Sequence, residues 1–321
     1  MALRPDGVPS KSAALDLERT LDTTRKHVNL LLVAKGLRAF GDGYVSLLLP
    51  LYLLQLGFSP LHVGVIATTT LVGSGVLTLA VGLHAWRYHY RSLLLAASAL
   101  MAGTGLGFAL VTDFWPLLLI ALVGTLNPSS GDVSVFMPLE HAVLARVVTD
   151  RQRTAMFARY SLVGSLLAAA GSLAVALPAM LAGVSGLSMT SAMQAMFLLY
   201  ALIAGAAGLV YRGLPKALVT EVRQPMAPLQ QSKQRVYTLA ALFSLDAFAG
   251  GFVVQSMVAL WLYQRFGMSL ATAGVVFFWT GVLTAASYLV AVRIAGRFGL
   301  VNTMVFTHIP SSVCLLLLPF V

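Results

Sequence analysis

Three charged side chains lie within the first long apolar run of this sequence, where charges are rare. Lys35, Arg38 and Asp42 are spaced by three and four residues, so on a helix they form one stripe. If the run crosses a bilayer, each charge near the centre costs about 2.5 to 3.5 kcal/mol, so the stripe should face protein or water. A helical rise of about 1.5 Å per residue from Asn29 places Asp42 about 20 Å deep.

Two interpretations of this stripe remain open. In the first, Asp42 binds a proton or a cationic group of a substrate, and Arg38 tunes its affinity. In the second, Arg38 and Asp42 form a permanent ion pair that only stabilises the helix bundle. The pair Ala247-Phe248 repeats Ala39-Phe40 and aligns Asp246 with Arg38, so charges of opposite sign occupy equivalent positions. We expect these charges to meet across a central cavity.

A second polar segment interrupts the apolar run that extends from Phe114 to about Leu144. This run is too long for one straight crossing of a hydrocarbon core about 30 Å thick. Pro128 removes a backbone donor and Gly131 loosens the helix, so an interrupted helix could offer its carbonyls and Asp132 to a substrate.

The alternative for this segment is a kinked helix whose polar residues satisfy their own backbone. In that case Glu140 and His141, which follow in the sequence, lie at the cytoplasmic interface.

The sequence contains no His-Glu-x-x-His motif and no phosphate-binding glycine loop, so zinc-protease and ATP-driven functions are not expected. A single cysteine, Cys314, excludes a disulfide framework, and we expect no metal or cofactor.

The composition is that of a membrane protein. Hydrophobic residues make up 58% and charged residues 10% of the 321 residues, and the mean hydropathy is +0.86. Soluble domains are about 25% charged, so the solvent of this chain is largely lipid. Residues 1–28 carry five basic and four acidic side chains and no long apolar core, which predicts a soluble cytoplasmic tail rather than a signal peptide.

Windows of about 20 apolar residues predict an all-α protein with nine membrane spans. The predicted spans are 29–56, 61–83, 92–111, 114–144, 160–181, 192–211, 237–263, 271–292 and 302–321. The polar segment 212–236 therefore divides a six-helix bundle, 29–211, from a partial second bundle, 237–321.

Basic residues are distributed unevenly between the two sides of these spans. Of the 21 Lys and Arg, 18 lie in the N-terminal tail or in the loops after even-numbered spans, and the opposite side holds only Arg265. The positive-inside rule therefore places the N-terminus in the cytoplasm, and we expect the plasma (inner) membrane. This distribution explains the net charge of +10 without a nucleic-acid partner.

The two bundles contain an internal repeat with an offset of 210 residues. Gly57, Ser59 and Arg87 recur as Gly267, Ser269 and Arg297. Two related sets of membrane helices are typical of a transporter whose substrate path lies between the sets. The third span matches the ninth, where the sequence stops, so we expect a fragment or a truncated reading frame. Small residues at 164, 168 and 172 predict close helix packing.

The loop after the second span of each set resembles the signature of the major facilitator superfamily, which has a Gly, an Asp-Arg pair, a Gly and further basic residues. Arg87 and Arg297 match the signature arginine, and Arg91 matches a later basic position. Gly299 matches the glycine, for which the first copy has His89. Trp86 and Gly296 stand where the family usually has Asp, so the charge pairs that latch the inward-closed face are altered.

The resemblance implies a secondary transporter, not an enzyme, that moves a small solute by alternating access, with protons as the candidate coupling ion. Asp42, Arg38, Asp246 and Asp132 would line the pathway, and the basic loops would gate it. Two alternatives remain: a non-transporting sensor or scaffold on the same fold, and an intramembrane aspartyl protease that uses two aspartates. The Gly-x-Gly-Asp motif of that protease family is not met at Phe40-Gly41-Asp42.

Overall fold

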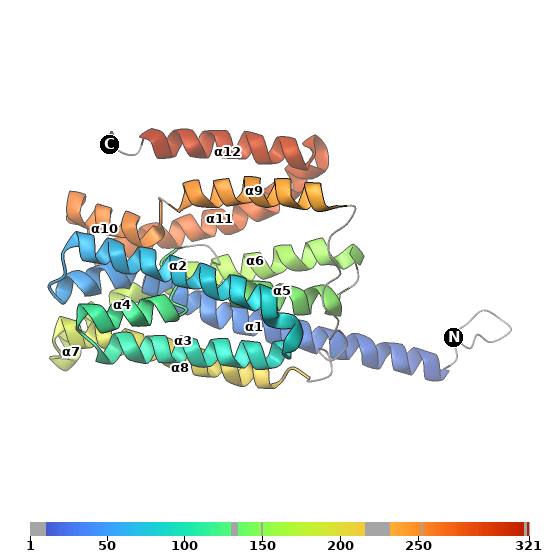
Figure 1. Cartoon of the computed structure of the whole chain (residues 1–321), viewed down its shortest axis with the longest axis horizontal. Coiled ribbons are helices and arrows are strands. Elements are labelled where there is room, and N and C mark those ends of the chain that lie inside the picture. The colour runs from blue at the N-terminus through green and yellow to red at the C-terminus, as the bar shows by residue number, and fades with distance from the viewer. Residues whose placement is uncertain are drawn as a thin grey trace.

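The structure, a computed structural model, describes residues 11–129, 134–148, 150–215, 232–251, 253–317 and 320. Side chains at 11–23, 150–152, 154, 292 and 300 are not described. Within these ranges the chain is helical and contains no strand. The helices run side by side along one long axis, and those after residue 232 lie together on one side of the bundle (Figure 1).

The first set of helices comprises α1 (Lys11–Gln55), α2 (Pro60–His84), η1 (Ala85–Arg87), α3 (Tyr90–Leu110), α4 (Phe114–Val123), α5 (Phe136–Val147), α6 (Asp150–Leu173), η2 (Ala174–Ala176), α7 (Leu177–Ser185) and α8 (Met189–Arg212). The second set comprises α9 (Lys233–Gly250), α10 (Gln255–Phe266), α11 (Leu270–Phe298) and α12 (Leu300–Leu317). By length and composition, seven candidate membrane spans are found in the described residues. The shorter apolar helices 114–123 and 301–317 occupy the predicted fourth and ninth spans.

The internal repeat is also present in the local structure. Gly57 and Gly267 both have positive φ angles, +89° and +61°, in the turns before α2 and α11. Ser59 and Ser269 then cap these helices, each accepting a hydrogen bond from the backbone N–H three residues later. The helices that follow, α3 and α12, also begin 210 residues apart. The repeat therefore reproduces helix boundaries as well as residue types.

The predicted fourth and seventh spans are both interrupted. In the fourth, α4 ends at Val123 and α5 begins at Phe136, so two helices stand where the interrupted-helix interpretation expects a break, and the proposed role of this segment toward a substrate stays a prediction. Asp132 and Gly131 lie outside the described residues. The predicted seventh span was a single helix, but α9 ends at Gly250 and α10 begins at Gln255. Two consecutive glycines, each about 1 kcal/mol less favourable than alanine in a helix, explain this break.

Helix α1 is the centre of the first set and lies against α6 at backbone contact. A Cβ atom added at Gly43 would lie 2.1 Å from the Ala168 carbonyl oxygen, and one at Gly171 would lie 2.1 Å from that of Phe40. Helix α11 also packs closely on α6, because a Cβ at Gly274 of α11 would lie 2.5 Å from the Ser172 carbonyl oxygen. The prediction that small residues of this helix serve close packing is confirmed.

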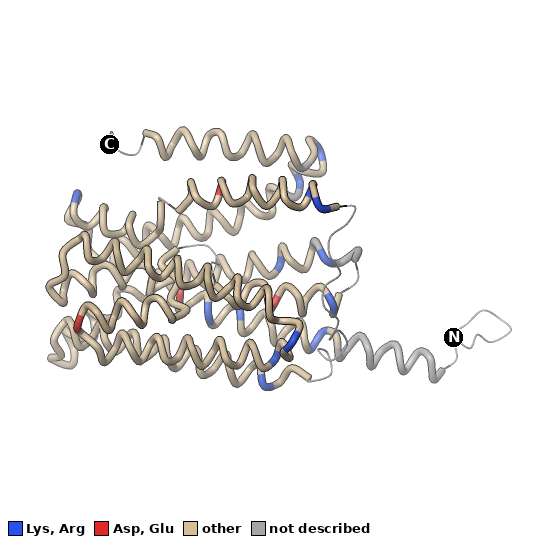
Figure 2. Tube along the Cα trace, viewed as in Figure 1, with Lys and Arg blue, Asp and Glu red and all other residues tan. Residues whose placement is uncertain are grey.

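Lysine and arginine residues gather at one end of the bundle (Figure 2). We call it the basic end. It contains η1, the last turns of α8 and α11, and the first turn of α9. The opposite end contains the loops 56–59, 111–113, 186–188 and 267–269. The two ends are one helix length apart, so the basic loops lie on one side of the bundle, as the distribution of basic residues in the sequence predicts.

Candidate functional site

A buried ion pair joins α1 to α5 inside the first set. Arg38 is 1% exposed and Glu140 is 0% exposed, and their side chains form a salt bridge between Nη2 and Oε2. The ring of Phe136 covers the guanidinium, with 4.0 Å from its centroid to Arg38 Cζ. The kinked-helix alternative placed Glu140 at the cytoplasmic interface. In this structure its carboxylate is buried among the helices, where the arginine neutralises it.

Two tyrosines complete the hydrogen bonds of this pair. Tyr211 of α8 donates to Glu140 Oε1 at 2.6 Å and accepts from Arg38 Nε at 3.1 Å. Tyr160 of α6 donates to Glu140 Oε2. We call Arg38, Phe136, Glu140, Tyr160 and Tyr211 the Arg38–Glu140 cluster. The cluster joins four helices, so Arg38 stabilises the bundle through a buried ion pair, as the second interpretation of the stripe expects. The carboxylate of this pair is Glu140, which comes from another helix.

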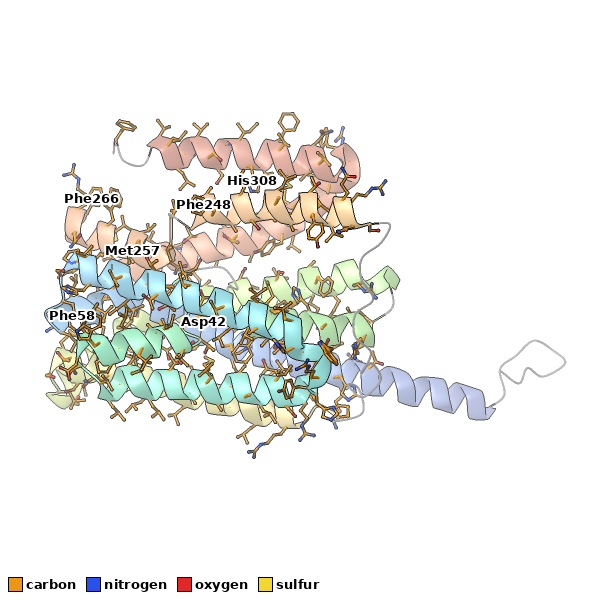
Figure 3. All side chains as sticks on the ribbon, in the orientation of Figure 1. Asp42, Phe58, Phe248, Met257, Phe266 and His308 are labelled. Carbon is orange, nitrogen blue, oxygen red and sulfur yellow. The ribbon has the colours of Figure 1, made fainter. Side chains whose placement is uncertain are left out.

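Asp42 lies one turn beyond Arg38 on α1 and is half-buried. Tyr200 of α8, itself fully buried, donates a hydrogen bond to Asp42 Oδ1 at 3.1 Å. Lys35, at the other end of the predicted stripe, is buried with its Nζ 5.1 Å from the Tyr160 ring centroid. Figure 3 shows Asp42 near the middle of the bundle's length. Of the three charges in the stripe, Asp42 is thus the most accessible.

Asp246, another predicted pathway residue, is not brought to Asp42, and Asp132 lies outside the described residues. Asp246 is exposed on α9, and none of the described side chains of that helix is buried. The expected meeting of charges across a central cavity is therefore not seen in this structure. Its absence follows from the position of α9, whose apolar residues Leu242 and Phe248 are exposed as well.

The arginines of the two basic loops are exposed or half-buried at the basic end. Arg87 lies in η1 with its Cζ 4.8 Å from the Trp86 ring centroid, and Arg297 lies in the last turn of α11. Trp86, which replaces the aspartate of the family signature, therefore contacts the signature arginine through its ring. Gly299 has a φ of +85°, whereas His89 at the equivalent position has an extended backbone with φ −74°. The first copy of the loop therefore needs no glycine.

A polar junction connects the two sets of helices near the two interruptions. Gln255 Nε2 of α10 donates to Ser46 Oγ of α1 at 3.1 Å, and the backbone N–H of Ser256 donates to the Pro128 carbonyl at 3.0 Å. Both residues of α10 are buried. The sequence interpretation did not assign a role to this junction, because partners 209 residues apart leave no local signal.

No group of three or more metal-ligating side chains occurs among the residues that the structure describes.

A family model of the Major Facilitator Superfamily matches residues 31–321. The chain belongs to the Major Facilitator Superfamily. The predicted membership of this family is confirmed by this match. The fold is that of an integral, multi-pass membrane protein.

Two further comparisons agree with this family. The chain is 26% identical over 328 aligned positions to the uncharacterized membrane protein YJR124C of Saccharomyces cerevisiae, covering 92% of this chain and 73% of that protein. It is similar in structure to the nucleoside transporter NupG (D323A mutant), with a TM-score of 0.61 and 14% identity, over 85% of this chain and 69% of that one. Membership in this family supports a membrane transporter rather than an enzyme.

Proposed function

We propose that this chain functions as a secondary transporter, moving a small solute across the membrane by alternating access, with protons as the coupling ion. The observation that carries the proposal is that, among the described residues, the two sets of helices contact each other toward the opposite end of the bundle and not at the basic end. Such an asymmetry is expected of a carrier that rocks about a central site and is caught open to one side.

The contacts toward the opposite end are close and partly polar. The hydrogen bonds of Gln255 and Ser256 join α10 to α1 and to the segment after α4. Next to them, a Cβ atom at Gly281 would lie 2.7 Å from Ala169 Cβ, so α11 packs tightly on α6. Backbone hydrogen bonds and small-residue contacts of this kind close a path without a large buried area.

The basic end differs because the second set is exposed there. Every described side chain of α9 is exposed, and the last buried residue among those described in α11 is Ala285, more than three turns before its end. The positive-inside rule assigns the basic end to the cytoplasm. The proposed state is therefore inward-open, with the N-terminus cytoplasmic and the plasma (inner) membrane as the site of action.

Asp42 is the proposed proton-binding residue of this carrier. Glu140 already neutralises Arg38, so the charge of Asp42 can change without leaving that arginine uncompensated. The hydroxyl of Tyr200 orients the carboxylate and can serve the ionised form as a donor. Asp246 and Asp132 as pathway residues, and Arg87, Arg91 and Arg297 as gating residues, belong to the same proposal.

The test is flux into proteoliposomes of the full chain that contain a pH-sensitive dye. With an imposed proton gradient, we expect one member of a panel of small polar solutes to accumulate while the gradient decays faster than in protein-free vesicles. Solute accumulation without any change in proton movement would remove proton coupling and keep the carrier. If no vesicle shows solute accumulation or proton movement, transport is rejected in favour of the sensor or scaffold alternative.

Replacing the polar junction tests alternating access directly. Gln255→Leu removes one buried hydrogen bond, worth about 1 kcal/mol, so the population open at the opposite end should rise about fivefold. Spin labels are attached at Leu187→Cys and Phe266→Cys in a Cys314→Ser background. Opening is then measured as a larger fraction of long distances between the two labels. Both labelled residues are exposed at the opposite end.

The matched control for this measurement is Gln264→Leu, the same substitution at an exposed position of the same helix. It should leave the distance distribution of the labelled protein unchanged. An equal shift in both variants, or no shift with Gln255→Leu, would contradict the assignment of the junction as a gate.

A further inference from the structure

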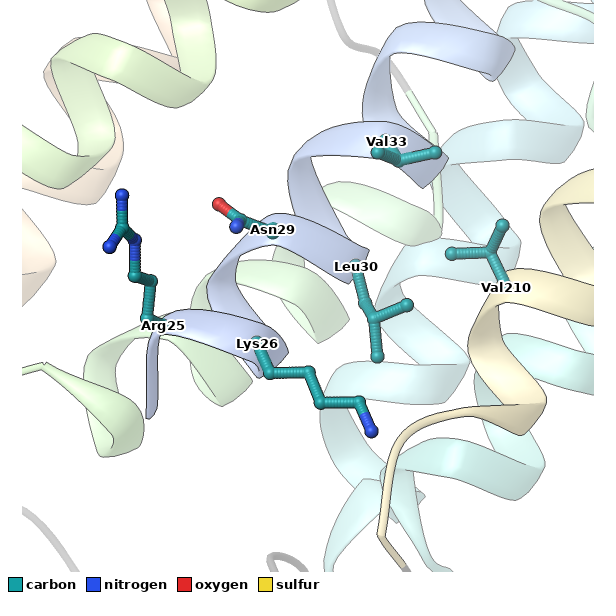
Figure 4. A pocket seen from close by; sticks show the side chains of 6 residues that line it. All are labelled: Arg25, Lys26, Asn29, Leu30, Val33 and Val210. Atoms are coloured by element: carbon teal, nitrogen blue, oxygen red, sulfur yellow. The ribbon is translucent and has the colours of Figure 1, made fainter. Parts of the chain in front are cut away.

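A groove of about 460 Å³ opens on the surface of the bundle at the basic end. It lies between α1 and the end of α8, and its lining residues are Arg25, Lys26, Asn29, Leu30, Val33 and Val210 (Figure 4). None of them belongs to the proposed solute pathway. The groove therefore requires an explanation of its own, whatever the solute.

The lining changes from charged to apolar along the helix axis. Lys26, Leu30 and Val33 are spaced by four and three residues, so they form one stripe of α1. Figure 4 shows these three side chains extending to the side on which Val210 of α8 faces them, while Arg25 extends away. Seven residues of helix place Val33 about 10 Å deeper than Lys26.

The position of this stripe in the membrane determines what can cover it. The candidate span Thr24–Gln55 lies within α1, and the two cations belong to its first turn, where we expect the lipid headgroups. Val33 is 52% exposed, at a depth where hydrocarbon surrounds the protein. A ligand of this groove must therefore present an anion at one end and an alkyl chain at the other.

We propose that the groove binds an anionic glycerophospholipid. The ammonium of Lys26 donates to the lipid phosphate, Arg25 adds positive potential, and one acyl chain lies on Leu30, Val33 and Val210. A free anion would use only the cations and leave the apolar half uncovered. A zwitterionic lipid carries its own cation, so the two basic side chains favour a net negative headgroup. The packing of α8 completes the wall, because a Cβ atom added at Gly213, the residue after this helix, would lie 3.3 Å from Leu30 Cδ1.

The experiment places the full chain in nanodiscs of phosphatidylcholine with a minority of phosphatidylglycerol, extracts it with mild detergent and measures the retained lipids by mass spectrometry. The wild type should retain phosphatidylglycerol above its share in the nanodisc. The variant Arg25→Gln/Lys26→Gln should lose this enrichment, by about fivefold for each cation removed. The matched control Lys233→Gln/Arg235→Gln, two exposed cations elsewhere at the basic end, should retain it.

A second variant tests the apolar half of the groove. Val33→Asn keeps both cations but places an amide where the acyl chain is proposed to lie, so enrichment should fall although the charge is unchanged. Thermal unfolding of each variant controls for loss of fold. If the control Lys233→Gln/Arg235→Gln loses as much lipid enrichment as Arg25→Gln/Lys26→Gln, the effect is general surface electrostatics and the proposal is overturned. Full retention by Val33→Asn, or displacement of the lipid by inorganic phosphate, would overturn the acyl-chain site.

Discussion

Glu140→Gln is expected to lower the free energy of unfolding by about 3 to 5 kcal/mol, because it leaves Arg38 as an uncompensated charge in the core. Both side chains are almost completely buried, so water cannot replace the carboxylate. Glutamine retains the shape, but its amide has a single acceptor oxygen, so it can accept from Tyr211 or from Tyr160 and not from both. The variant therefore loses the negative charge and one acceptor. Thermal and denaturant-induced unfolding of the detergent-solubilised chain measures the effect.

The matched control is the double variant Arg38→Gln/Glu140→Gln, which removes both charges and keeps hydrogen-bonding groups at both positions. Removing a buried pair together is often nearly neutral, whereas removing one partner is costly. The double variant should therefore be more stable than Glu140→Gln alone. If the two variants are equally unstable, the contribution of the glutamate is not electrostatic and the cluster acts only through its shape.

The features that the sequence predicts well are those with a local physical cause. A glycine with positive φ and a serine N-cap act within a few residues, so Gly57-Phe58-Ser59 and Gly267-Met268-Ser269 identify the repeat and the starts of two helices. The interruption of the fourth span was likewise predictable, because its length and Pro128 are properties of the segment itself.

Features that depend on tertiary packing were not predicted. The partnership of Arg38 with Glu140 joins residues 102 positions apart, and only the placement of α5 against α1 brings the carboxylate to the guanidinium. The stripe itself, by spacing alone, suggested Asp42 as the partner. The interruption at Gly250 was missed because no proline marks it in an otherwise apolar run.

The exposure of Asp246 illustrates a different kind of limit. Repeat alignment places Asp246 opposite Arg38, but alignment assigns equivalent positions within each set and not the distance between the sets. In a carrier that alternates, this distance changes during the cycle at the basic end. Under the proposed alternating access, the expected meeting with the stripe of α1 therefore requires a conformation other than this one, in which none of the described side chains of α9 is buried.

Asp42→Asn is expected to reduce proton-driven solute accumulation to the level of protein-free vesicles. Asparagine has nearly the same shape and can still accept the hydrogen bond of Tyr200, but it cannot bind and release a proton. The fold should be unaffected, because Asp42 is half-buried and the Arg38–Glu140 cluster remains complete. Initial rates under an imposed pH gradient measure the effect, and Asp113→Asn, in the exposed loop before α4, is the matched control.

Solute exchange in the absence of a gradient separates the two roles that Asp42 can have. If Asp42→Asn retains exchange and loses only gradient-driven accumulation, the carboxylate carries the coupling proton. If exchange is lost as well, the carboxylate binds a cationic group of the solute, since binding is needed in both assays whereas the proton is needed in one. Full accumulation by this variant would remove Asp42 from the pathway. The same pair of assays on Asp246→Asn then tests whether the second set supplies a carboxylate when α9 approaches α1 in the other half of the cycle.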